Sequence, residues 1–255
     1  MLVSSVPRDL RKAALFPIRA ERTSRAVPWT TLAIVAANVA MFAWELRLTW
    51  LLGPGALTAF IDTYAFVPGR FLAHPFSPDQ WRTVFTAMFM HAGWLHIGSN
   101  MLFFWVFGAG LEDRLGHLRL LAFYLVAGVA GTVAQALVAP ASMVPTLGAS
   151  GAIAGVLAGY LLVFPRRRVT TLIFIVFFVE VAALPAWIMI GVWLLSQVAS
   201  GIGALEGAAA ASSGVAYFAH LGGFAAGAVM AVPLLLADRS RATRPGAGRA
   251  RGRRG

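Results

Sequence analysis

The sequence contains no cysteine, which excludes disulfide frameworks, cysteine-based metal sites and a cysteine nucleophile. It is also poor in charge: only 12% of its 255 residues are charged, against roughly 25% in a soluble domain. Hydrophobic residues make up 59% of the chain, and the mean hydropathy is +0.75. The few charges gather at the chain ends and in short loops. This distribution is typical of a polytopic membrane protein.

Several functional motifs are absent too. There is no H-E-x-x-H, and the neighbouring histidines His91 and His96 have no acidic partner, so we expect no metal site. A phosphate-binding G-x-x-x-x-G-K-[ST] is also missing, and we expect no cofactor. The net charge of +11 comes from tails and loops beside apolar runs, which indicates membrane orientation rather than nucleic-acid binding. The first 28 residues lack the apolar core of a cleavable signal peptide.

Apolar runs of the length needed to cross a bilayer, about 20 residues, recur along the chain. We predict an all-α polytopic protein, a six-transmembrane-helix bundle with a large first outer loop. Glu180 and Pro185 interrupt the long apolar stretch 170–198, so 170–183 is interpreted as an interfacial or re-entrant piece. The expected spans are approximately 28–50, 95–111, 118–139, 148–165, 184–200 and 215–237.

The predicted organisation has three parts. A basic cytoplasmic segment (1–27) precedes the six-span domain (28–237), and a basic, disordered cytoplasmic tail (238–255) follows it. Of the Lys and Arg residues, six lie in the N-terminal segment, two after the second span, three after the fourth and seven in the tail, against three on the other side. The positive-inside rule therefore predicts a multi-pass protein of the cytoplasmic membrane with both termini in the cytoplasm.

Polar groups within apolar spans are costly, so they are candidates for function. They are His96, Asn100, Ser150, Glu180 and His220. Ser150 precedes Pro165 by 15 residues, and His220 precedes Asp238 by 18, which corresponds to about 22 and 27 Å of helix. Both therefore lie at similar depth, a few ångströms below the outer edge of an apolar core about 30 Å thick.

Glycines repeat every four residues in the spans that carry Ser150 and His220. Such stripes allow close helix approach in lipid, and a histidine nitrogen near a serine hydroxyl activates a nucleophile. Alone, the stripes indicate only packing, and a single serine usually makes an interhelical hydrogen bond. The candidate packing residues are Gly148, Gly151, Gly155, Gly223 and Gly227.

His96 and Asn100 share one helix face, and both can donate hydrogen bonds to a developing oxyanion. They could equally be interhelical polar contacts. The backbone amide of Ser150 is a further candidate donor. An acidic third member is not evident, so a Ser–His dyad is the simpler proposal.

These residues together resemble the rhomboid family of intramembrane serine proteases. GASGAIAG at Gly148–Gly155 is similar to its serine motif, which implies that Ser150 is the nucleophile. AHLGGFAAG at Ala219–Gly227 is similar to its histidine motif, which implies that His220 is the base. HIGSN at His96–Asn100 matches its H-x-x-x-N, whose members line the oxyanion hole.

Two further motifs complete the resemblance, which covers about residues 28–237. WR at Trp81–Arg82 resembles the motif of the family's large first loop, and LEDRLG at Leu111–Gly116 resembles the segment after span two. The resemblance implies structural roles for Trp81, Arg82, Glu112 and Arg114. The family often has an aromatic residue four positions after the nucleophile, where this chain has Ala154; Tyr217 or Phe218 could substitute.

The resemblance implies hydrolysis of peptide bonds in the transmembrane segments of other membrane proteins, near the outer face. The bilayer and these substrates are the expected partners, and the oligomeric state is not predicted. The alternatives are a catalytically silent relative that binds membrane helices and a small transporter or channel. No paired inverted repeat supports the transporter.

Overall fold

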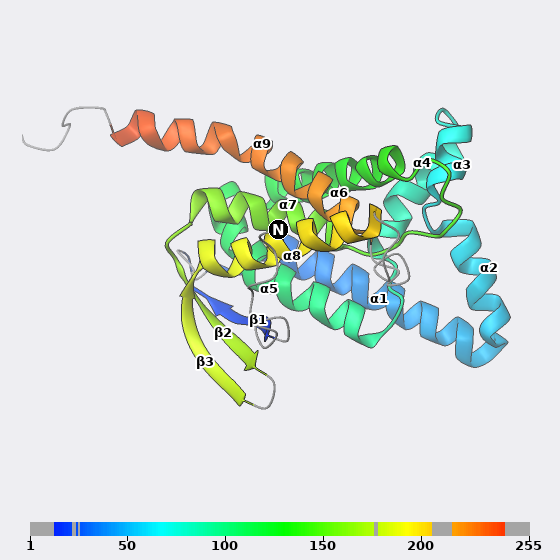
Figure 1. Ribbon diagram of the computed structural model, residues 1–255, viewed down its shortest axis with the longest axis horizontal. Helices are drawn as coiled ribbons and strands as arrows, with labels where there is room; N and C mark the ends of the chain where they lie inside the picture. Colours follow the sequence, from blue (N-terminus) through cyan, green and yellow to red (C-terminus); the bar gives the residue numbers. More distant parts are fainter. Residues whose placement is uncertain (1–12, 22–23, 25, 176–177, 206–215, 243–255) are drawn as a thin grey trace, which may run out of the picture.

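The computed structural model describes residues 13–21, 24, 26–175, 178–205 and 216–242. Six larger helices pack side by side, with a small sheet at one end and short helices at the other (Figure 1). The larger helices are α1 (Trp29–Leu52), α5 (Trp94–Leu115), α6 (His117–Val138), α7 (Ser150–Val163), α8 (Ala186–Leu205) and α9 (Tyr217–Ala242).

Five of these helices, all except α7, are long and apolar enough to cross a membrane. The prediction of a polytopic helical membrane protein is thereby confirmed, although α7, the fourth expected span (148–165), is shorter than predicted. Helix α7 has 14 residues, or about 21 Å, and every residue from Gly151 to Tyr160 is buried. It therefore lies inside the bundle, surrounded by protein, as Figure 1 shows.

The all-α prediction was wrong for the sheet. Residues expected as an interfacial or re-entrant piece form the antiparallel hairpin of β2 (Arg168–Ile175) and β3 (Phe178–Pro185). Strand β1 (Ala13–Ala20), from the expected N-terminal segment, pairs antiparallel with β2. The β2 sequence RVTTLIFI is rich in β-branched residues, which favour strands, and β1 provides a partner from the far end of the chain.

The chain ends differ from the expected domain limits. Helix α9 continues to Ala242, five residues into the predicted disordered tail. The rest of that tail, the first 12 residues and the predicted loop before the sixth span (206–215) lie outside the described residues.

The expected first loop is mostly helical. It contains α2 (Pro54–Tyr64), α3 (Pro68–Ala73), α4 (Pro78–Thr86) and the 3-10 turn η2 (Ala87–Phe89). Phe66 and Thr146 exchange two backbone hydrogen bonds of 3.1 and 2.7 Å, which tie this region to the connection between α6 and α7. Trp81 donates its indole N–H to the Pro75 carbonyl, and the Arg82 guanidinium lies over the Tyr64 ring and 3.5 Å from Asp79.

Glu112 binds the N-terminus of α1 from the end of α5. Its carboxylate accepts the backbone N–H groups of Thr30 and Thr31, at 2.8 and 2.9 Å, and the Thr31 hydroxyl at 2.6 Å. Pro28 precedes α1 and has no side-chain cap to offer, so Glu112 satisfies amides that the helix cannot satisfy itself. Arg114 lies in the last turn of α5.

Candidate active site

The glycine stripes of α7 and α9 face each other. A Cβ added at Gly223 would collide with the carbonyl oxygen of Gly151, and one added at Gly227 would collide with that of Gly155. The two backbones are therefore in direct contact, which larger residues would prevent. Gly148 is not part of this contact; it precedes α7, has φ +128° and packs against the His96 ring.

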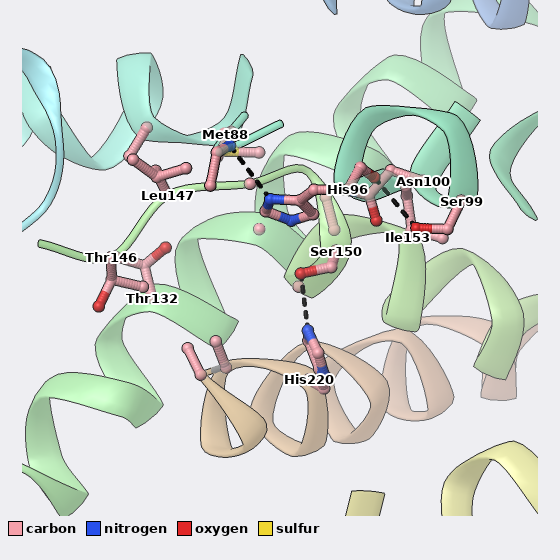
Figure 2. Close-up of a pocket in the computed structure, with 18 of the residues that line it drawn as sticks. Met88, His96, Ser99, Asn100, Thr132, Thr146, Leu147, Ser150, Ile153 and His220 are labelled. Atoms are coloured by element: carbon pink, nitrogen blue, oxygen red, sulfur yellow. Dashed lines mark hydrogen bonds between the residues drawn. The ribbon is translucent and has the colours of Figure 1, made fainter. Parts of the chain in front are cut away.

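This contact brings together the first turns of α7 and α9. Ser150 is the first residue of α7, and His220 lies in the first turn of α9. The Ser150 Oγ and His220 Nε2 atoms are 2.6 Å apart, as the dashed line in Figure 2 marks. His220 is buried, with 8% of its surface exposed. A serine hydroxyl held against an imidazole nitrogen is the geometry of an activated nucleophile.

The other ring nitrogen of His220 has a partner that the sequence analysis missed. His220 Nδ1 lies 2.6 Å from the side-chain oxygen of Gln197 on α8. A signal was present, because Ser196 and Gln197 are polar residues within an expected span.

Aromatic rings on two helices flank His220. The Trp193 ring, on α8, has its centroid 6.0 Å from that of His220 at an interplanar angle of 39°. Tyr217 approaches edge-on at 6.5 Å. Tyr217 thus reaches the histidine, as the sequence suggested, whereas the closer Trp193 was not anticipated.

His96 and Asn100 face Ser150 from the first turns of α5 (Figure 2). His96 Nδ1 accepts the backbone N–H of Ala92 at 3.3 Å, so the neutral ring carries its proton on Nε2, beside Gly148. The buried Asn100 side-chain nitrogen has no hydrogen-bond partner in the described part of the chain. The unpaired Asn100 amide thus lines the same cavity as the His96 ring and the Ser150 hydroxyl.

These groups line one cavity of about 590 Å³. Ser150, His220, His96 and Asn100 contribute its polar side, and most of the remaining wall is apolar. The apolar lining includes Met88, Phe103, Leu147, Ile153, Leu157 and Trp193. The volume accommodates several side chains of a peptide.

Glu180, the carboxylate expected within an apolar stretch, lies away from the cavity and is exposed on β3. Glu45, a buried carboxylate of α1, accepts the backbone N–H of His91. Burial lowers the pKa of the His91 imidazole to about 4, so this ring is neutral at pH 7.

Comparison with known proteins identifies a family. The family profile described as the Rhomboid domain matches residues 78–237, a range that includes His96, Asn100, Ser150 and His220. Rhomboid-like protein 11, chloroplastic, of Arabidopsis thaliana is 31% identical over 168 residues, 64% of this chain and 55% of the relative.

Of two shorter matches, one is named a protease and the other is named inactive. Rhomboid protease GluP of Bacillus subtilis is 36% identical over 35% of this chain and 17% of its own. Inactive rhomboid protein 1 of Drosophila melanogaster is 35% identical over 32% of this chain and 6% of its own. The chain thus spans about half or less of the length of the curated relatives it matches. From the profile match and these similarities, the chain belongs to the rhomboid family.

Proposed function

We propose that the protein is a serine endopeptidase that cleaves transmembrane segments of other membrane proteins with a Ser150–His220 dyad. The observation that carries this proposal is the 2.6 Å contact between Ser150 Oγ and His220 Nε2 in a cavity that His96 and Asn100 also line. The Bacillus subtilis relative, whose name is that of a protease, adds support.

The proposed reaction proceeds through an acyl-enzyme. His220 Nε2 takes the Ser150 proton while Oγ attacks the scissile carbonyl carbon. The oxyanion accepts hydrogen bonds from His96, Asn100 and the backbone amide of Ser150. His220 then protonates the leaving amine as the C–N bond breaks. In the second half of the reaction His220 takes a proton from water as the water oxygen attacks the acyl carbon. The protonated His220 then gives this proton to Ser150 Oγ as the ester C–O bond breaks and the new carboxyl group leaves.

The substrate class follows from the expected depth of the site. With both termini in the cytoplasm, Ser150 lies near the outer face, where water is within reach. Attack requires an extended peptide, but lipid requires that backbone groups be hydrogen-bonded. Substrate helices with small or helix-breaking residues near the outer face are therefore expected to be cleaved faster than rigid leucine-rich helices.

The second candidate is a catalytically silent protein that binds membrane helices. The Drosophila melanogaster relative named Inactive rhomboid protein 1 supports this alternative only in being named inactive. A fluorophosphonate probe separates the candidates, because covalent labelling of Ser150 requires an activated hydroxyl, whereas helix binding does not.

The test is cleavage of a model transmembrane substrate by purified protein, with Ser150→Ala and His220→Ala beside the wild type. Matched controls are Ser200→Ala, on a partly exposed position of α8, and His74→Ala, on an exposed one; both residues lie outside the cavity. We expect cleavage to be lost in both dyad variants and kept in both controls, with unchanged thermal unfolding. Cleavage by Ser150→Ala would refute the nucleophile. A wild type that neither cleaves nor reacts with the probe would favour the binding protein.

A further inference from the structure

A chain of hydrogen bonds links α8 to the reactive hydroxyl. The Ser196 hydroxyl donates to the Trp193 carbonyl at 2.6 Å, and the Gln197 side-chain N–H donates to the Ser196 oxygen at 3.0 Å. The Gln197 oxygen lies 2.6 Å from His220 Nδ1, and His220 Nε2 lies 2.6 Å from Ser150 Oγ.

The donors and acceptors of this series of hydrogen bonds can be assigned in only one consistent way. Because Ser196 receives the amide N–H of Gln197, the amide presents its oxygen, which can only accept, to His220. His220 Nδ1 must therefore be the protonated nitrogen of the neutral ring. Nε2 is then the unprotonated nitrogen, which accepts the Ser150 hydroxyl. The amide of Gln197 thus selects the tautomer that a general base for Ser150 requires.

The surroundings make this selection necessary. His220 is buried, and among the described residues the hydrogen-bond partner of its Nδ1 is Gln197 alone. In a dry site an unpaired N–H is unfavourable, so without Gln197 the ring would rotate or change tautomer. A neutral amide also suits a position within an apolar helix, where a carboxylate would be costly.

We propose that Gln197 is a positioning residue that holds His220 in the reactive tautomer and orientation. The effect of Gln197 on catalysis rests on the proposed protease function. The hydrogen bond between Gln197 and His220 can be tested without measuring cleavage. Three helices then contribute to the dyad: α7 and α9 carry Ser150 and His220, and α8 carries the residue that orients His220.

The test compares Gln197→Leu, Gln197→Glu and the matched control Ala199→Leu, which places the same side chain on an exposed position of α8. We expect Gln197→Leu to lower kcat for a model transmembrane substrate about tenfold, the rate equivalent of one neutral hydrogen bond, with KM within about twofold. Labelling of Ser150 by the fluorophosphonate probe should slow by the same factor. Gln197→Glu keeps a hydrogen-bond acceptor at this position, so its kcat should be close to that of the wild type.

A second readout does not need activity. ¹⁵N NMR of histidine-labelled protein, with the His220 signals assigned by their loss in His220→Ala, reports which ring nitrogen carries the proton. We expect protonated Nδ1 in wild type and in Ala199→Leu, and a mixture of tautomers in Gln197→Leu. The proposal would be overturned if Gln197→Leu left both the His220 tautomer and kcat unchanged. It would also be overturned if Ala199→Leu lowered kcat as much as Gln197→Leu, or if Gln197→Glu were as slow as Gln197→Leu. A wild type with protonated Nδ1 but no cleavage and no labelling would refute the protease function while leaving this bond established.

Discussion

Asn100 keeps its side-chain nitrogen buried and without a hydrogen-bond partner in the described residues, in the wall of the cavity that Ser150 also lines. A buried unpaired donor destabilises a resting protein. In the proposed reaction this cost is offset in the transition state, when a negatively charged oxygen forms next to the amide. The residue is therefore better explained by catalysis than by folding.

We expect Asn100→Ala to lower kcat about 10²-fold, because it removes one donor to the oxyanion. Stability should be kept or should rise, since the variant removes a buried unpaired donor and none of its hydrogen bonds is lost. The measurements are steady-state cleavage and thermal unfolding in detergent. Asn38→Ala is the control: this buried asparagine of α1 bonds the Ile34 carbonyl and lies outside the cavity, so stability should fall while kcat is kept. Equal kcat in Asn100→Ala and wild type would exclude it from the oxyanion site.

Among the elements, the pair of α7 and α9 decides the geometry of the dyad. Gly227 lies two turns below His220, and a Cβ there would collide with the Gly155 carbonyl and come 2.5 Å from the Gly155 Cα. Neither neighbour is a side chain that can rotate away. Relief therefore requires the two helices to move apart, which would also lengthen the contact between Ser150 and His220.

We expect Gly227→Ala to destabilise the protein by about 1–3 kcal/mol, the usual effect of overpacking, and to lower kcat as well. Thermal unfolding and cleavage assays on the same preparation measure both effects. Gly191→Ala is the matched control, because a Cβ at Gly191 in α8 meets nothing within 4 Å. If both variants behaved like wild type, the backbone contact between α7 and α9 would not be needed for the site.

The helices were predictable because a run of about 20 apolar residues can satisfy its backbone hydrogen bonds in a membrane by forming a helix, and few other structures can do so. The sheet was not, because a short apolar run such as VTTLIFI fits either a helix or a buried strand, and its partner β1 lies some 150 residues away. The same limit applies to the site. Its motif residues were found along the sequence, whereas Gln197 matters only because α8 and α9 pack together, which no local pattern encodes.

For the whole molecule, the strongest asymmetry is electrostatic. In the predicted six-span arrangement, eighteen of the 21 basic residues would lie on the side that carries both termini and three on the other, a bias that favours cytoplasmic termini. Under this orientation the connection between α6 and α7, which carries the exposed Met143, faces outward. The first turn of α6, which carries the exposed Leu118, faces the cytoplasm.

The absence of cysteine makes this orientation directly measurable, because each introduced thiol is the only one in the chain. In intact cells, a membrane-impermeant maleimide should label Met143→Cys, but should label Leu118→Cys only after permeabilisation. Both side chains are more than half exposed, so a difference between them reports sidedness rather than burial. The reverse pattern would place the termini and the basic residues outside. Ser150 would then lie near the inner face, and the proposed preference for substrate helices that unwind near the outer face would have to be abandoned.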